Sequence, residues 1–206
     1  LAIVRYDANH MQALAGLDKT LGVLISVARQ AAREGELNEA SRVLKILTSS
    51  LVAHPEIAGV AAELERSKQA SQWFQKALAF EKEKKILAIA NNENSSSENN
   101  AVAAYRKALE IYPDYQPASR AIDRLRSLRE QAAMRLVKQN KFEAAVIALK
   151  QAEVIDANNP QLQLISGHVY GRLNQAIREN IVLANLALDG LRIDPARQYH
   201  DQAKRI

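Results

Sequence analysis

Histidines are the first residues to consider for catalysis or metal binding, because imidazole is both a general base near neutral pH and a metal ligand. The chain has four, and none belongs to a His-x-x-x-His or His-Glu-x-x-His pattern. His54 precedes Pro55, so we interpret it as a turn residue. His168 follows Gly167 in an expected helix, and the simplest interpretation is a half-exposed surface side chain. We therefore predict no metal site.

Other reaction chemistries also lack their residue patterns. The chain has no cysteine, which excludes a disulfide framework, a thiolate nucleophile and a cysteine zinc site. It contains no Gly-x-x-x-x-Gly-Lys-Ser/Thr loop to bind phosphates and no Gly-x-Ser-x-Gly turn to present a nucleophile. The carboxylates in residues 81–85 alternate with lysines, which is typical of a solvated helix face. We predict that the protein is not an enzyme and needs no cofactor.

One aromatic pair, Trp73 and Phe74, could contact a ligand. Adjacent residues on a helix diverge by about 100°, so at most one of these rings points fully into the core. Core filling is the simpler interpretation, and a ligand-stacking or interface role is the alternative.

The composition favours helices as the elements that position these residues. The chain has 206 residues, of which 48% are hydrophobic and 5% aromatic, with 7 Gly and 5 Pro. A sandwich or barrel of this length needs many more Gly and Pro for its turns. We therefore predict an all-α fold, and leave open whether 56–90 is one helix or two. The predicted helices are 10–34, 37–53, 56–90, 100–112, 115–139, 142–156, 160–173 and 175–192, with a last one beginning near 196.

The sequence also repeats itself. Phe142, Ala145, Leu149 and Ala152 are spaced by three or four residues, which indicates one apolar helix face. At an offset of 105 residues, similar residues coincide without gaps over the first half of the chain. Examples are Ala28 with Ala133, Ala40 with Ala145, Leu44 with Leu149, and Pro55 with Pro160. We predict an internal duplication, with copy one at about 7–112, copy two at about 113–206, and a polar loop at 91–100.

Two segments resemble the tetratricopeptide repeat, a helix–turn–helix unit of about 34 residues that stacks into a superhelix. Residues 101–113 resemble the second helix of a repeat with its closing proline, and residues 142–152 resemble another. Gly167 and Tyr170 then stand where the next first helix expects a glycine and an aromatic residue. The resemblance implies one α-solenoid domain over 1–206, built from stacked antiparallel hairpins. It also implies a non-enzymatic scaffold or adaptor for protein–protein interaction.

In this family the first helix of each hairpin lines a concave groove that receives a peptide or helix of the partner. Transferring that arrangement predicts six groove residues: Arg29, Arg33, Met134, Lys138, His168 and Arg172. Arginine can bind a carboxylate through two parallel hydrogen bonds. The expected partner is therefore a protein with an acidic or carboxylate-ended segment.

The net charge of +5 and the pI near 9.5 raise a second hypothesis, a module that binds a polyanion. A resemblance to envelope proteins, together with Trp73, raises a cell-wall glycan as the other ligand of such a module. Basic residues are spread from Arg5 to Arg205 and alternate with glutamates, a pattern that disfavours nucleic acid. A homodimer formed through the helix at 56–90 is a further alternative that periodicity does not decide.

The sequence predicts no transmembrane segment, because no stretch reaches about eighteen apolar residues. The chain starts at Leu1 without a methionine, so we expect a fragment of a longer protein. The long helices and the polar loop resemble repeat regions of bacterial envelope proteins, which implies a periplasmic or envelope location. A cytoplasmic location is the alternative.

Overall fold

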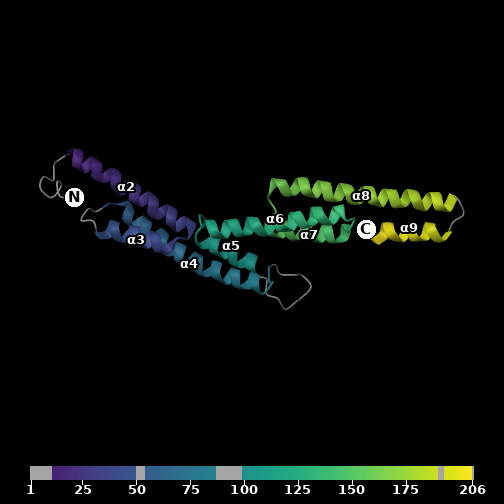
Figure 1. Cartoon of the computed structure of the whole chain (residues 1–206), viewed down its shortest axis with the longest axis horizontal. Helices are drawn as coiled ribbons and strands as arrows, with labels where there is room; N and C mark the ends of the chain where they lie inside the picture. Colours follow the sequence, from purple (N-terminus) through teal and green to yellow (C-terminus); the bar gives the residue numbers. More distant parts are fainter. Residues whose placement is uncertain (1–10, 50–53, 87–98, 190–192, 206) are drawn as a thin grey trace. The chain divides into compact units, whose positions relative to one another are not determined.

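The computed structural model describes residues 11–49, 54–86, 99–189 and 193–205, and the regular secondary structure of these residues is α-helical. The chain divides into two compact units, 1–121 and 122–206. The prediction of an all-α fold is confirmed for the described part of the chain (Figure 1).

The first unit is built from helical hairpins. Helix α2 (Met11–Glu34) packs against α3 (Leu37–Ser49), both contact α4 (Glu56–Lys82), and α4 packs against α5 (Ala101–Ile111). The core between α2, α3 and α4 is formed by aliphatic side chains at helical spacing. Its buried members are Leu21, Ile25, Ala28, Val43, Leu47 and Val60.

Aromatic rings fill the contact between α4, α5 and the start of α6. Phe74 lies 5.5 Å from Tyr105 and 6.0 Å from Tyr115, measured between ring centroids. The Tyr105 hydroxyl also donates a hydrogen bond to Glu81 of α4. Phe74 is thus the member of the Trp73–Phe74 pair that joins this ring cluster.

The second unit contains most of α6 (Gln116–Lys138), together with α7 (Phe142–Ile155), α8 (Pro160–Asp189) and α9 (Ile193–Arg205). Helix α8 packs against both α7 and α9. Alternation of alanine with larger residues lets the helices approach closely. The core consists of Ala133, Val137, Phe142, Ala145, Ala148, Leu149, Ala152, Leu162 and Val169.

The hairpin turns after α2 and α6 have the same geometry. Gly35 (φ 75°) and Asn140 (φ 56°) both adopt the left-handed conformation that ends a helix. After α2, the N–H of Glu36 bonds to the carbonyl of Ala31. After α6, the N–H of Lys141 bonds to the carbonyl of Leu136, and the same six-to-one bond is formed. Glycine and asparagine are the residues that tolerate this conformation best, so both turns follow from local sequence.

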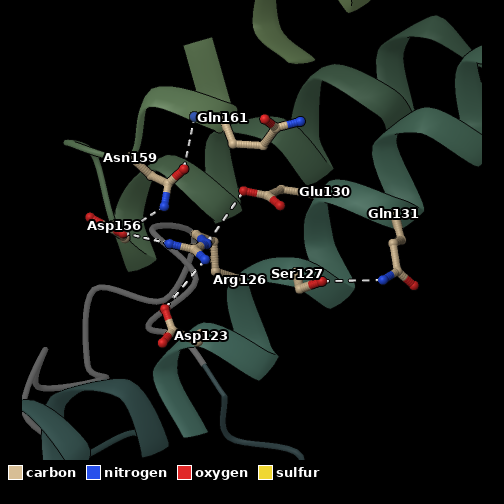
Figure 2. Close-up of polar contacts among 8 residues, drawn as sticks. All are labelled: Asp123, Arg126, Ser127, Glu130, Gln131, Asp156, Asn159 and Gln161. Atoms are coloured by element: carbon tan, nitrogen blue, oxygen red, sulfur yellow. Dashed lines mark hydrogen bonds and ion pairs between the residues drawn. The ribbon is translucent and has the colours of Figure 1, made fainter. Parts of the chain in front are cut away.

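A partly buried ion cluster joins α6 to the connection between α7 and α8 (Figure 2). Arg126 lies 2.7 Å from Asp156, 3.3 Å from Asp123 and 3.4 Å from Glu130, measured between side-chain nitrogen and oxygen atoms. The Asn159 side chain accepts a hydrogen bond from the N–H of Gln161 and thereby caps the start of α8. The cluster ties the middle of α6 to the end of α7 and the start of α8, which is a structural role.

The structure corrects one predicted break. Helices were predicted at 160–173 and 175–192, but α8 is continuous from Pro160 to Asp189. No proline or glycine lies between Arg172 and Asp189, and Asn174 is exposed, so nothing interrupts the backbone hydrogen bonds.

The region predicted at 56–90 contains one helix, α4, which passes through Lys68 and ends at Lys82. The other predicted starts and ends agree with the structure to within three residues where both lie in described parts of the chain. The largest difference is at α9, which was predicted to begin near 196 and begins at Ile193. Three predicted helix ends, 53, 90 and 192, lie outside the described residues, as does most of the loop at 91–100.

Candidate functional site

The predicted groove residues of the first unit, Arg29 and Arg33, share one hollow of about 340 Å³. They are one helical turn apart on α2, and the opposite wall comes from the start of α4. The hollow is polar and is lined by Asp18, Gly22, Ile25, Ser26, Arg29, Gln30, Arg33, His54 and Glu56. Residues at i and i+4 on a helix are neighbours, so both guanidiniums lie on one face of α2.

Acidic residues of this unit already pair with these arginines. Arg29 lies 2.6 Å from Glu56 and 3.2 Å from Glu63, both on α4. The hydrogen bond to Glu56 raises the pKa of Arg29, and the charge of Glu63 adds to that effect. Arg33 lies 3.5 Å from the exposed carboxylate of Asp114, a longer and weaker contact. The hollow is therefore of mixed charge, and Arg33 is the arginine that an incoming carboxylate could reach most easily.

His54 lies two residues before the first residue of α4, in agreement with its interpretation as a turn residue. Its Nδ1 accepts a hydrogen bond from the N–H of Glu56, and its Nε2 lies 3.8 Å from Asp18. These contacts satisfy a free N–H at the start of the helix.

The remaining predicted groove residues lie in the second unit. On α6, Met134 is half-buried and Lys138 is exposed. On α8, His168 and Arg172 are both exposed, and Arg172 donates a hydrogen bond of 2.7 Å to the side chain of Gln175. Only His168 and Arg172 belong to a larger exposed surface within this unit.

That surface is a row of side chains along one face of α8. Leu164, Val182 and Leu186 are 70%, 56% and 62% exposed. At about 100° per residue, they fall with His168 and Arg172 within an arc of about 80°. The row is about 33 Å long at 1.5 Å per residue. We call it the α8 stripe; its members are Leu164, His168, Arg172, Gln175, Glu179, Val182 and Leu186.

The α8 stripe has apolar ends and a hydrogen-bonded centre. Arg172 donates to Gln175, and Gln175 donates to Glu179 at 2.8 Å, so the central side chains form a chain along the helix. Leu164, Val182 and Leu186 were not predicted as a surface, because a predicted helix break separated Leu164 from the other two. A single helix from Pro160 would have revealed their common face by spacing alone.

An apolar hollow of about 340 Å³ lies on another side of the same helix end, between α8 and α9. Ile181 and Leu188, both about half exposed, form one wall, and Ala196 and His200 form part of the other. The last ten residues of α8 thus present large aliphatic side chains to solvent in several directions.

The described part of the chain contains neither a metal-binding cluster nor a membrane-spanning helix. No cluster of three or more His, Asp or Glu side chains there could bind a metal ion. No described helix is long and apolar enough to cross a membrane.

Comparison with protein-family models, with curated proteins and with solved structures finds no match.

Proposed function

We propose that this protein is a non-enzymatic scaffold that binds a peptide or helix of a partner protein along the α8 stripe. The exposed aliphatic side chains of α8 carry the proposal. Large apolar residues that cluster on the surface of one element are typical of protein–protein interaction sites. Leu164, Val182 and Leu186 could receive apolar side chains of a partner, and the polar centre could fix its register.

We further propose that the fold is a tetratricopeptide-like solenoid with an internal duplication at 105 residues. The helix boundaries support this. Helices α2 and α3 start at Met11 and Leu37, and α6 and α7 start 105 positions later, at Gln116 and Phe142. The two left-handed turn residues, Gly35 and Asn140, are also 105 positions apart. Equal spacing of starts and turns is what a duplication of one hairpin unit would produce.

An acidic or carboxylate-ended segment remains the proposed partner chemistry for the hollow of Arg29 and Arg33. Such a segment would have to displace Asp114 from Arg33, because Arg29 is engaged by two carboxylates on α4. Charge reversal of Arg33 therefore tests this site with less damage to the fold than reversal of Arg29.

A periplasmic or envelope location is also part of the proposal and rests on the family resemblance. The polyanion or glycan alternative rests on the net charge and on Trp73, which lies beside three basic side chains.

The stripe proposal is tested with a double variant, Val182→Glu with Leu186→Glu, which places two charges in the apolar end of the stripe. The control is Ile147→Glu on α7, outside the stripe. The Ile147 side chain is 52% exposed, so this variant also replaces an exposed aliphatic side chain by a carboxylate. Each purified protein is used as bait in an extract of the source cells, and its circular dichroism and sedimentation velocity are recorded.

We expect wild type and Ile147→Glu to retain the same partner, and the double variant to lose at least about nine-tenths of it, because two charges would have to be desolvated. Equal retention by the folded double variant would contradict the proposal. If the stripe instead joins two copies of this chain, sedimentation velocity will show a dimer that the double variant lacks.

A further inference from the structure

The members of the α8 stripe are spaced almost evenly on both sides of Gln175. Leu164 and Leu186 each lie eleven positions from Gln175, one before it and one after it. His168 and Val182 each lie seven positions from it. If two copies of α8 run antiparallel with Gln175 opposite Gln175, every member of the stripe therefore lies opposite another member, and leucine lies opposite leucine at both ends.

The arginine and the glutamate of the stripe lie on opposite sides of Gln175. Arg172 is three positions before Gln175, and Glu179 is four positions after it. In the antiparallel pair, Arg172 of each copy would lie opposite the partner's Glu179. One contact that is made twice is typical of a two-fold interface, in which both copies use the same surface. Opposite charges that meet across an interface also fix its register.

The two charges lie near the same edge of the stripe. At about 100° per residue, Arg172 and Glu179 are about 20° apart around α8. A two-fold axis between antiparallel helices places each edge of the stripe against the same edge of the partner's stripe. The guanidinium of one copy and the carboxylate of the other would therefore lie on one side of the helix pair, within reach of each other.

Within one copy, both charges form hydrogen bonds with a neutral amide. Arg172 donates to the side chain of Gln175 at 2.7 Å, and Gln175 donates to Glu179 at 2.8 Å. An amide carries no net charge, so these bonds hold the two side chains along the stripe without neutralising them. An ion pair with a second copy would supply the opposite charge.

The same charges disfavour a parallel pair. In a parallel arrangement each residue lies opposite itself, so Arg172 would face the partner's Arg172 and Glu179 would face the partner's Glu179. Like charges placed together across an interface weaken it. The stripe is therefore complementary to itself in the antiparallel direction, and an unrelated partner would have to reproduce the same order of charges and leucines.

The size of the stripe predicts a weak dimer. A strip about 33 Å long and about 10 Å wide, the diameter of one helix, has a projected area of about 330 Å² on each copy. The two copies together fall below about 1,200 Å², the range of weak and transient interfaces. We therefore expect a dissociation constant of about 10–100 µM.

We propose that the α8 stripe pairs with the α8 stripe of a second copy of this chain, antiparallel about Gln175, through leucine contacts at both ends and two ion pairs between Arg172 and Glu179. This inference rests on the proposed function and names its partner. The protein retained in the extract experiment would then be the source cells' own copy of this protein.

The test reverses the two charges and measures self-association of the full chain by sedimentation equilibrium at about 5–500 µM. Arg172→Glu and Glu179→Arg each place like charges opposite one another twice in the dimer. Each single variant should therefore weaken the dimer by about tenfold or more. The double variant, Arg172→Glu with Glu179→Arg, restores opposite charges and should dimerise within about threefold of wild type.

A mixture of the two single variants gives a second, independent readout. The Arg172→Glu chain carries two carboxylates on the stripe and the Glu179→Arg chain carries two guanidiniums, so an equimolar mixture should form a mixed dimer. The control is Lys150→Glu, which reverses an exposed charge on α7, outside the stripe, and should dimerise like wild type. Circular dichroism verifies that each variant is folded.

Three results would overturn the inference: a wild-type chain that stays monomeric up to about 500 µM, single variants that dimerise like wild type, or a double variant no tighter than the single variants. The extract experiment separates this failure from that of the proposed function. If the wild-type bait retains a different protein and the Val182→Glu, Leu186→Glu variant loses it, the stripe is an interaction site for another partner. If the bait retains nothing, the proposed function fails as well.

Discussion

At the scale of single residues, Gly35 and Asn140 both have the left-handed backbone conformation. They differ in the space around the side chain, because the surroundings of Gly35 leave no room for a Cβ atom. A Cβ atom added at Gly35 would lie 2.9 Å from the Tyr115 hydroxyl oxygen and 3.1 Å from the Pro117 ring. Gly35→Ala therefore combines a strained left-handed backbone with a steric clash, and we expect a loss of about 2 kcal/mol or more in the free energy of unfolding.

The matched control is Asn140→Gly, which relieves backbone strain at the equivalent turn. We expect its free energy of unfolding to change by less than about 1 kcal/mol. Urea unfolding followed by circular dichroism measures both variants. Equal stability of Gly35→Ala and wild type would show that the turn after α2 does not need glycine.

The raised pKa values of two buried tyrosines predict how the free energy of unfolding changes at alkaline pH. Burial raises the pKa of both Tyr112 and Tyr115 above the usual value. As the pH rises past about 10, the unfolded chain loses these phenolic protons before the folded chain does. The tyrosines therefore leave the free energy of unfolding unchanged below that pH and lower it above.

The double variant Tyr112→Phe with Tyr115→Phe should remove part of this alkaline decline. Urea unfolding at about pH 9 and about pH 11 measures the decline, with Tyr170→Phe, an exposed tyrosine, as the control. The same decline in the double variant and in the control would mean that the two phenols do not titrate differently on unfolding.

At the scale of elements, the Arg126 cluster lies at positions that the proposed duplication aligns with an apolar contact of the first unit. Leu21 and Ile25, which are buried on α2, lie 105 positions before Arg126 and Glu130. Glu130 is only 8% exposed, so its carboxylate depends on the guanidinium. Arg126→Leu alone should cost about 3 kcal/mol, because it leaves the buried carboxylate of Glu130 without its guanidinium.

Adding Glu130→Ile to Arg126→Leu recreates the pair of side chains found at Leu21 and Ile25. We expect the double variant to recover most of the lost free energy of unfolding, to within about 1 kcal/mol of wild type. Urea unfolding of the single and double variants measures this. A double variant less stable than the single variant would show that the cluster is needed for the fold itself.

Helix boundaries were predictable where a glycine or a proline ends or begins the helix. Gly35, Pro55 and Pro160 mark the ends and starts of helices in the structure as they do in the sequence. The predicted break before Gln175 was wrong because no residue there disrupts a helix. The end of α4 at Lys82 was not predictable, since residues 60–90 contain neither glycine nor proline.

The candidate site was predictable only where one helix determines it. The family resemblance pointed to Arg29 and Arg33 on α2, but their carboxylate partners lie 27 to 81 positions later in the chain, at Glu56, Glu63 and Asp114. No periodicity in one sequence reveals such pairs.

At the scale of the whole molecule, the two units carry different surface chemistry. The first contains the mixed-charge hollow of α2 and a hollow between α4 and α5 that Trp73 and Phe80 line together with basic side chains. The second exposes aliphatic side chains on α8. In the proposed scaffold role, these surfaces would be separate contacts, each selecting a different feature of a partner.

Site-specific photo-crosslinking in the source cells tests the central proposal, that the α8 stripe binds a partner, most directly. A photoreactive amino acid replaces Leu164, Val182 or Leu186 in turn, and Ile147 serves as the control position. We predict that all three stripe positions give the same discrete crosslinked protein and that Ile147 gives none. No crosslinked protein at the stripe, or the same product at Ile147, would contradict the account.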